Sequence, residues 1–239
     1  MNNKTEKASV LCIIPARGGS KGVVRKNVKN LNGKPLICWT IEEAKKSRYV
    51  DRIIVSTDDE EISSISKNSG AEIIPRPAEI ASDNSPIMDT ILHSVRILEE
   101  SGYYPDYIML LQCTSPLRRT EHIDEAIEKL VSCKDEADSL VSVVKIEHPP
   151  WWYKTIDDAG YMHDFMDYDR IKLSRRQDFP PVYNTNGAIY IAKTEVLKQI
   201  KDFELGRPLA YIMDRISSID IDEEMDFLVA ELMMKYRNG

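Results

Sequence analysis

A short apolar run at residues 10–14, ended by Pro15 and followed by a glycine-rich loop, constrains the fold of this chain most strongly. A continuous apolar run of this length predicts a strand that is buried on both faces of a parallel sheet. The loop carries Gly18, Gly19 and Gly22, which let backbone N–H groups approach an anion closely. A strand that leads into such a loop predicts a phosphate-binding site at its end.

The charges around this loop are segregated. No Asp or Glu occurs between residues 8 and 41, although the whole chain has a net charge of −7. The cations in the same window are Arg17, Lys21, Arg25, Lys26, Lys29 and Lys34. A basic loop in an acidic protein favours a polyanionic ligand. The alternative is an ordinary strand-to-helix turn beside a solvated basic face.

The composition limits the class of protein. The chain has 239 residues, of which 42% are hydrophobic and 30% are charged, and these values suit one large soluble α/β domain. Its acidic balance argues against general nucleic-acid binding, which needs an extended basic surface. No apolar run approaches the roughly 20 residues that span a bilayer, and the polar N-terminus lacks an apolar signal core. We expect a cytoplasmic protein that binds neither nucleic acid nor membrane.

The cysteines and histidines form no recognisable catalytic or metal-binding pattern. Cys12, Cys38, Cys113 and Cys133 include no C-x-x-C pair, and none lies near a histidine at zinc-finger spacing. We expect reduced thiols, with Cys12 and Cys113 buried inside strands. The four histidines are scattered and suggest no nucleophilic triad.

The first part of the chain predicts a β-α-β-α-β series. Apolar spacing indicates a helix over residues 35–47, and strands follow at 52–56 and 72–74. Asp58 or Asp59 is expected to cap the helix between those two strands, which ends at a glycine. This alternation favours a doubly wound, mostly parallel sheet.

The alternation continues downstream. Strands are expected at 107–111, 139–144, 187–192, 209–213 and 218–221, and helices at 87–101, 121–132, 194–200 and 222–236. Thr120 is a candidate cap for the helix that follows it. On the last helix, the residues expected to face the core are Met225, Leu228, Val229, Leu232 and Met233.

Residues 148–183 break this pattern. The segment is rich in aromatic residues, Asp, Arg and Pro, and it is too long for an ordinary connection in a compact domain. The adjacent Trp151 and Trp152 suggest either an interface with another subunit or a lid. A small satellite core under a long loop is the alternative. We predict a single domain over residues 1–239 with this segment inserted.

The glycine-rich loop matches neither of two common phosphate motifs. In a Walker loop the lysine follows the last glycine, whereas Lys21 precedes Gly22. A dinucleotide fingerprint needs G-x-G-x-x-G, whereas Gly18 and Gly19 are adjacent. The sequence therefore supports neither an ordinary P-loop ATPase nor a Rossmann dehydrogenase.

Asp220 and Asp222 form a second candidate constellation. On the strand expected at 218–221, residues i and i+2 point to the same face, so the two carboxylates would converge. Mg²⁺ is commonly held by one or two carboxylates together with substrate phosphates. The alternative is that Asp222 caps the last helix and Asp220 is a surface acid.

Two further groups of polar residues are candidates for ligand contacts. Gln112 and Thr114 follow a central strand, and ligands of open α/β sheets bind outside such strand ends. Arg175 and Arg176 lie in the irregular segment, and arginine binds carboxylates in bidentate geometry. The alternatives are turn chemistry for the first pair and a solvated basic patch for the second.

Taken together, these motifs resemble the signature of the N-acylneuraminate cytidylyltransferases, the CMP-sialic acid synthetases. The resemblance runs from about Val10 to Met234, and it depends on several segments in the expected order. They are Pro15-Ala16-Arg17-Gly18-Gly19-Ser20-Lys21-Gly22, Lys26-Asn27, Ile54-Val55-Ser56-Thr57-Asp58, Arg76-Pro77, Leu111-Gln112-Cys113-Thr114-Ser115-Pro116-Leu117-Arg118, Arg175-Arg176-Gln177, Asn186-Gly187-Ala188-Ile189-Tyr190 and Ser218-Ile219-Asp220-Ile221-Asp222.

The resemblance implies an enzyme. Its fold would be a Rossmann-like α/β nucleotidyltransferase with a protruding dimerisation element, corresponding here to about residues 148–183, and it would form a homodimer. A nonulosonic acid, an acidic nine-carbon sugar, would attack the α-phosphorus of CTP, giving a CMP-sugar and pyrophosphate. Mg²⁺ or another divalent cation would be required.

The resemblance also implies roles for individual residues. The nucleotide-binding set would be Arg17, Gly18, Gly19, Ser20, Lys21, Lys26, Asn27, Arg76, Ser85 and Gln112. The substrate-binding set would be Gln112, Thr114, Arg175, Arg176 and Asn184. Arg17 and Lys21 would hold the triphosphate, and Arg175 or Arg176 the sugar carboxylate; these four form the expected catalytic set. Asp220 and Asp222 would bind the metal.

One residue departs from the pattern of the resembled family, so the identity of the sugar is not determined. Many relatives have Arg at the position of Asn184, which lies two residues before Asn186-Gly187. Legionaminic or pseudaminic acid and a GTP-using relative therefore stay alternatives, whereas Kdo enzymes usually have Arg at the position of Lys21. A non-catalytic nucleotide-binding protein and a purely structural α/β domain are the alternatives from other classes.

Overall fold

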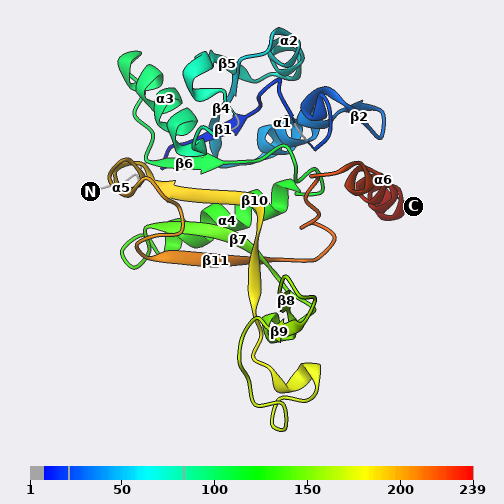
Figure 1. Cartoon of the computed structure of the whole chain (residues 1–239). Helices are drawn as coiled ribbons and strands as arrows, with labels where there is room; N and C mark the ends of the chain where they lie inside the picture. The colour runs from blue at the N-terminus through cyan, green and yellow to red at the C-terminus, as the bar shows by residue number, and fades with distance from the viewer. Residues whose placement is uncertain (1–7, 21, 83, 239) are drawn as a thin grey trace.

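The first apolar run forms β1 (Val10–Pro15), which lies inside a seven-stranded sheet (Figure 1). The structure is a computed structural model that describes residues 8–20, 22–82 and 84–238. All residues of β1 except Pro15 are buried. It pairs in parallel with β4 (Val50–Thr57) on one side and with β6 (Tyr107–Leu110) on the other. The prediction of a parallel strand buried on both faces is confirmed.

The sheet has the strand order β11-β7-β10-β6-β1-β4-β5, where β5 is Glu72–Pro75. β10 (Tyr183–Lys193) runs antiparallel to β6 and to β7 (Ser139–Lys145). β11 (Pro208–Met213) pairs in parallel with β7. Within the described residues, β10 is the antiparallel strand of an otherwise parallel sheet, as the mixed α/β class predicts.

Helices cover both faces of the sheet. α1 (Leu36–Lys46), α2 (Glu60–Ser69) and α4 (Thr120–Ser132) pack against one face. α3 (Ile87–Glu100) and α5 (Thr194–Ile200) pack against the other. Successive side chains of β1 face these two layers in turn, which explains why its sequence is apolar throughout.

Two helix starts differ in how well their caps were predicted. Asp59 caps α2, since its side chain accepts a 2.9 Å hydrogen bond from a backbone N–H of the first turn, and Gly70 ends that helix. Thr120 is the first residue of α4, whose cap is Arg119. The Thr120 hydroxyl donates to Glu43 at 2.8 Å instead, so the prediction of a Thr120 cap is wrong.

The last helix, α6 (Glu224–Asn238), buries a different face from the one predicted. Its buried residues are Phe227, Ala230 and Met234, with Met233 partly buried beside them. The exposed residues include four of the five expected in the core, which are Met225, Leu228, Val229 and Leu232. The helix carries two apolar stripes, and the one containing Phe227 contacts a separate small core that includes Val23, Leu36 and Ile221.

The strand predicted at 218–221 is absent from the described structure, where these residues form a turn and an irregular segment. Asp214 shapes the turn by accepting hydrogen bonds of 2.9 Å from the backbone N–H groups of Ile216 and Ser217. The N–H of Ile221 donates to the carbonyl of Thr114 at 2.8 Å. The same-face argument for Asp220 and Asp222 therefore does not apply, because they do not lie on a strand.

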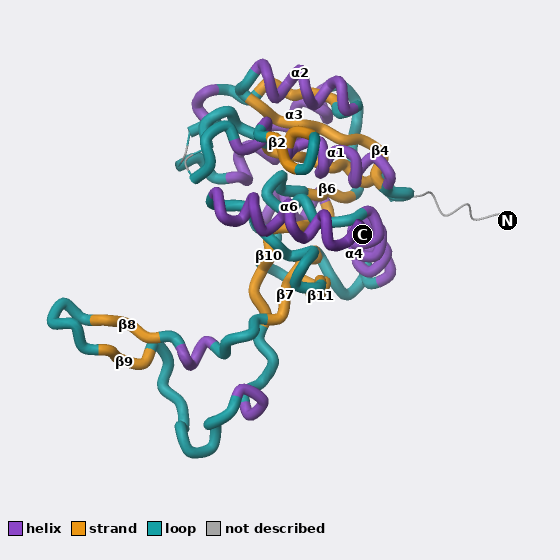
Figure 2. The backbone as a smooth tube through the Cα atoms, turned by 90° about the vertical axis from the view of Figure 1, so that its right-hand side faces the viewer, coloured by secondary structure: helices purple, strands orange, loops and turns teal. Residues whose placement is uncertain are grey.

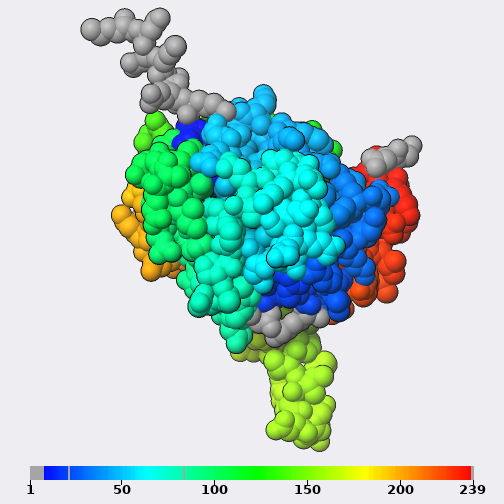
Figure 3. All heavy atoms as spheres, turned by 90° about the horizontal axis from the view of Figure 1, so that it is seen from above, coloured from blue at the N-terminus to red at the C-terminus, as the bar shows by residue number. Residues whose placement is uncertain are grey.

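Residues 148–183 form an arm that extends past the β11 edge of the sheet (Figures 1 and 2). It contains a two-stranded hairpin, β8 (Lys154–Ile156) and β9 (Met162–Asp164). At its base, Trp151 stacks on Phe179 with 5.3 Å between ring centroids, and Trp152 meets the same ring edge-on at 5.8 Å. Both tryptophans thus form a small aromatic core within the arm. Figure 3 shows the arm emerging from beneath the globular body.

Short elements complete the described chain. They are the 3-10 helices η1 (Lys26–Val28), η2 (Ala78–Ile80), η3 (Pro150–Trp152) and η4 (Arg176–Asp178), and the two-residue strands β2 (Asn30–Leu31) and β3 (Lys34–Pro35). None of the helices in the described ranges is both long and apolar enough to cross a bilayer. Lys21 and the polar residues 1–7 lie outside the described residues.

Asp138, just before β7, joins the ends of three strands. Its carboxylate accepts from Arg207 at 2.8 and 2.9 Å and from Lys193 at 3.3 Å. These partners, Arg207 first, lower the pKa of Asp138 to about 2. A depressed native pKa stabilises the fold above the unfolded pKa of about 4, and this stabilisation is lost as the pH falls toward 2.

We therefore expect Asp138→Asn to lower Tm at pH 7 by roughly 2–4 °C, the effect of about 1 kcal/mol. The deficit relative to wild type should shrink between pH 4 and pH 2, because the wild-type carboxylate becomes protonated there. Thermal melts across this range measure it, with Asp135→Asn as a control that removes a neighbouring exposed carboxylate. A deficit that is constant with pH would contradict the assignment.

Candidate active site

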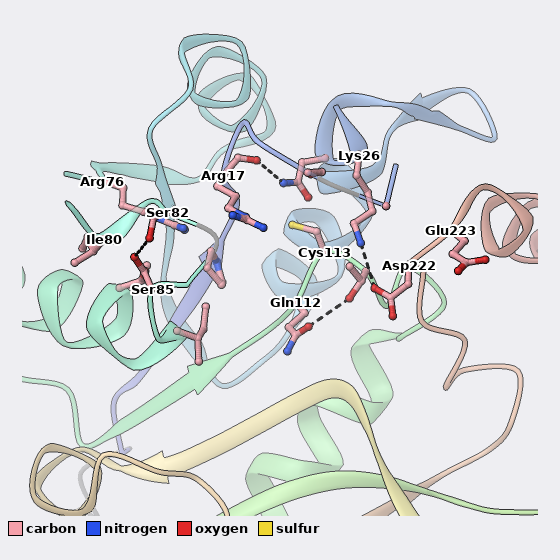
Figure 4. Close-up of a pocket in the computed structure, with 17 residues that line it drawn as sticks. Arg17, Lys26, Arg76, Ile80, Ser82, Ser85, Gln112, Cys113, Asp222 and Glu223 are labelled. Atoms are coloured by element: carbon pink, nitrogen blue, oxygen red, sulfur yellow. Dashed lines mark hydrogen bonds and ion pairs between the residues drawn. The ribbon is translucent and has the colours of Figure 1, made fainter. Parts of the chain in front are cut away.

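A cavity of about 590 Å³ opens where β1 and β6 end, beside the point at which the strand order reverses (Figure 4). Its walls come from the glycine-rich loop, the segment after β5, the start of α3, the segment after β6 and the segment before α6. The residues that line it are Pro15, Arg17, Ser20, Gly22, Lys26, Asn27, Arg76, Ile80, Ser82, Ser85, Ile87, Thr90, Gln112, Cys113, Thr114, Asp222 and Glu223.

Most of the site residues expected from the sequence therefore line one cavity. Those that do are Arg17, Ser20, Lys26, Asn27, Arg76, Ser85, Gln112, Thr114 and Asp222. Gly18 and Gly19 belong to the same loop but are not among the lining residues. Lys21, for which a triphosphate contact is expected, lies outside the described residues.

The glycine-rich loop is held on its outer side by the N-terminal end of α2. The N–H of Gly18 donates to Asp58 at 3.0 Å, and a Cβ added at Gly18 would lie only 2.7 Å from a carboxylate oxygen of Asp59. Arg25 adopts the left-handed conformation, with φ of 57°, and forms ion pairs with Asp59 and Glu61. These contacts fix the conformation of the loop.

On its inner side the loop meets the segment that carries the aspartates. A Cβ added at Gly22 would overlap the backbone carbonyl oxygen of Asp222, so the absence of a side chain is required there. The ammonium group of Lys26 donates to the carbonyl of Ile221 at 2.6 Å and lies 3.5 Å from the carboxylate of Asp222. The structure thus brings the cations and the distant acidic pair together.

The two aspartates have different environments. One carboxylate oxygen of Asp220 is buried and has no hydrogen-bond partner within the described residues. Burial raises the pKa of Asp220, and the nearby Asp222 carboxylate adds to the rise. The side chain of Asp222 is 77% exposed at the cavity. A divalent cation would supply the missing partner of Asp220, so this pair fits Mg²⁺ held jointly with substrate phosphates.

No cluster of three or more His, Cys, Asp or Glu ligands occurs in the described ranges. The donor set here is therefore the two carboxylates, which is compatible with Mg²⁺ because that ion usually keeps several waters.

Two further groups bring polar chemistry to the cavity. The buried guanidinium of Arg76 donates to the carbonyl of Ser56 at 2.7 Å, and burial lowers its pKa. On the opposite wall, the side-chain oxygen of Gln112 accepts from the hydroxyl of Thr114 at 3.4 Å. A cationic wall thus faces an amide that can both donate and accept.

A second cavity of about 420 Å³ adjoins the first and shares Ile87 and Gln112 with it. It is lined by Tyr190 and Phe203, whose rings lie 5.6 Å apart, and by charged residues that include Glu204. Burial raises the pKa of Tyr190, and the carboxylates of Glu204 and then Asp220 add to this rise. Tyr190 therefore lies near both the second cavity and the candidate metal site.

Sequence reasoning did not select Tyr190 or Phe203 as site residues. Tyr190 belongs to the segment Asn186-Gly187-Ala188-Ile189-Tyr190. Side chains alternate between the two faces of a strand, and this alternation was the signal that could have identified Tyr190. Phe203 lies in a loop after α5, and nothing in the sequence indicates that this loop returns to Gln112.

Three predicted substrate residues do not line the main cavity of their own chain. Arg175 is on the arm and pairs with Asp178 at 3.0 Å. Arg176 lines a separate cavity of about 510 Å³ at the base of the arm, together with Lys145 and Phe179. Asn184 is exposed on β10 opposite Val144.

Neither Cys12 in β1 nor Cys113 has the properties of a nucleophile. Cys113 is buried as expected but lies in the turn after β6, so the prediction that it lies inside a strand is wrong. Burial raises the pKa of the Cys12 thiol and of the Cys113 thiol to about 12, so both are protonated at neutral pH. The chemistry available here is positioning, charge neutralisation and metal binding, which is what phosphoryl-type transfer requires.

Comparison with known proteins identifies the family of this chain and its fold. A family model described as cytidylyltransferase matches residues 11–237. The chain belongs to the cytidylyltransferase family. Its fold is also that of CMP:2-keto-3-deoxy-manno-octonic acid synthetase complexed with CTP, with a TM-score of 0.71 at 16% identity, over 96% of this chain and 100% of that one. The Rossmann-like nucleotidyltransferase fold predicted from the sequence is confirmed.

Curated relatives of this cytidylyltransferase fall into two length classes. N-acylneuraminate cytidylyltransferase of Escherichia coli is 38% identical over 97% of this chain and 54% of its own length. CMP-N,N'-diacetyllegionaminic acid synthase of Legionella pneumophila is 35% identical over 95% of this chain and 96% of its own. The chain thus spans about half the length of the first relative and nearly all of the second.

The Gly22–Asp222 contact gives a direct test of the site's architecture. Gly22→Ala places a methyl group against the Asp222 carbonyl, so we expect a lower Tm and roughly tenfold weaker nucleotide binding by calorimetry, as the loop and the aspartate segment separate. Gly19→Ala is the matched control for stability, because a Cβ there meets nothing within 4 Å. Equal melting temperatures for the two variants would contradict the contact.

Proposed function

We propose that this cytidylyltransferase activates a nonulosonic acid, a sialic-acid-like sugar, with CTP in the cytoplasm and releases pyrophosphate. The observation that carries the proposal is the meeting of the basic glycine-rich loop with Asp222 at one cavity. Asp220 does not line this cavity and lies beside it, near Gly187. The names of the E. coli and Legionella relatives support an acidic nine-carbon acceptor.

In the proposed reaction, the anomeric hydroxyl of the sugar attacks the α-phosphorus of CTP. A new phosphorus–oxygen bond forms as the hydroxyl gives up its proton to water, the bond to the bridging oxygen of the β-phosphate breaks, and pyrophosphate leaves with the electron pair. Arg17, Lys26 and Arg76 would offset the charge of the triphosphate, and the same role is expected for Lys21. Mg²⁺ held by Asp220 and Asp222 supplies further charge neutralisation when bound.

The second cavity is the best candidate for the acceptor. It shares Gln112 with the main cavity, and its Tyr190–Phe203 surface suits the apolar face of a sugar or an acyl group. Sialic and legionaminic acids both stay candidates, because each is named in a relative of similar identity.

We further propose that the protein is a homodimer in which the arm completes the site of the partner. Arg175 and Arg176 are exposed on the arm and do not line the main cavity of their own chain. A second copy is the available source of these arginines for the sugar carboxylate. The arm also exposes Tyr153, Ile156 and Phe165, which a partner would cover.

Pyrophosphate release tests the reaction. Wild-type protein with Mg²⁺ and CTP should release pyrophosphate with at least one sugar from a panel of sialic, legionaminic and pseudaminic acids, with GTP and Kdo as the comparison substrates. Asp220→Asn should lower kcat by about a hundredfold or more, the loss typical of removing an electrostatic contact to the transition state, and keep the wild-type Tm. Glu231→Gln, at a partly exposed side chain on α6, is the control. Absence of release with every pair would reject the reaction.

Mixing two inactive variants tests the arm. Arg175→Ala/Arg176→Ala carries intact aspartates, and Asp220→Ala carries an intact arm, so a heterodimer regains one complete site. After subunit exchange we expect about a quarter of wild-type activity, since half of the dimers are mixed and each has one site of two. Light scattering should give twice the 27.4 kDa chain mass. A monomeric wild type, or no recovery from stable mixed dimers, would contradict the arrangement.

A further inference from the structure

Arg118 is a fully buried arginine whose guanidinium lies next to the polar end of β6. It is 2% exposed. One guanidinium nitrogen donates to the carbonyls of Ala188 at 2.7 Å and Gln112 at 3.2 Å. The other donates to the hydroxyl of Thr40 at 2.9 Å. Three elements, α1, the end of β6 and β10, thus converge on one side chain.

Burying the charge of Arg118 in this way lowers the stability of the fold. Within the described part of the chain, no carboxylate forms an ion pair with Arg118, and its Nε has no hydrogen-bond partner. Burial lowers the pKa of Arg118 to about 10, so the group is still charged at neutral pH. A buried charge without an ion-pair partner destabilises a fold, so the three hydrogen bonds that Arg118 donates point to a positional role at the groups it binds.

The carbonyl of Ala188 belongs to an interruption of the sheet. The β10–β7 register shifts between Thr185 and Tyr190, which leaves backbone groups without ladder partners. Side chains replace those partners. The N–H of Ile189 donates to Ser142 at 2.7 Å, the N–H of Ala188 donates to Asn186 at 3.2 Å, and Arg118 binds the Ala188 carbonyl.

This bulge places Gly187 between two site residues. Gly187 has φ of 71°, and a Cβ added there would lie 3.6 Å from the Gln112 side-chain oxygen and 3.7 Å from a carboxylate oxygen of Asp220. Asn186 donates to the hydroxyl of Ser218 at 2.8 Å, which ties the bulge to the segment that carries Asp220. One buried polar network therefore connects the backbone of Gln112 with the neighbourhood of Asp220.

We propose that Arg118 is a positioning residue for the transfer reaction. From behind the site, its guanidinium joins the Gln112 carbonyl to the β10 bulge and so fixes the Gln112 side chain where the nucleotide and acceptor cavities meet. This inference rests on the proposed function, because it assigns Arg118 a role in that reaction. Arg118 touches no substrate and acts through Gln112.

A double-mutant cycle with Gln112 separates positioning from general stability. Arg118→Met should lower kcat/KM for the acceptor by about tenfold in the wild-type background and by less than about twofold in the Gln112→Ala background. Arg118→Lys, which keeps the charge but loses the forked donor geometry, should show an intermediate loss. The neighbouring, exposed Arg119→Met should leave kcat/KM unchanged.

The cycle also distinguishes the two levels of the proposal. If Arg118→Met does not fold, as judged by thermal melting, the same cycle is run with Arg118→Lys. Equal losses in both backgrounds, with wild type active, would overturn the positioning role and leave the transferase function standing. Wild type that releases no pyrophosphate would overturn the function and the positioning role together.

Discussion

The site depends on the contact between the glycine-rich loop and the segment before α6. Gly22 packs directly on the backbone of Asp222, and Lys26 donates to the Ile221 carbonyl from the same loop. The cations of the loop repel one another, and so do the two carboxylates of the aspartate segment. Here the Lys26 ammonium and the Asp222 carboxylate lie close enough to stabilise each other, and both residues line one cavity. In the proposed reaction, the charged triphosphate would lie between them.

The sheet makes this contact possible. The glycine-rich loop follows the carboxyl end of β1, and Gln112 follows the carboxyl end of β6, the parallel strand next to it. The N–H of Ile221 donates to the carbonyl of Thr114, which lies in the segment after β6. The aspartate segment is therefore anchored by the same strand end that supplies Gln112. Residues separated by most of the chain meet because parallel strands end at one edge of the sheet.

The sequence allowed good prediction wherever local chemistry decides the structure. The buried β1 run, the Asp59 cap and the loop of spaced cations each depend on neighbours in the chain, and each is found as expected. Prediction was poorer where the local sequence is compatible with two arrangements and tertiary contacts determine which one forms. α6 carries two apolar stripes, and only the position of Leu36 and Ile221 decides which one is buried. The Phe203 loop and the arm arginines depend on distant packing that no local pattern encodes.

The position of β10 between β6 and β7 has a consequence for assembly during synthesis. The strands β1, β4, β5 and β6 are complete once residue 110 has been made, so this half of the sheet has its partners early. The outer edge of β6 then stays unpaired until residues 183–193 emerge. During this interval we expect the nascent chain to present the open edge of a mostly apolar strand, where chaperone contact or misassembly would concentrate.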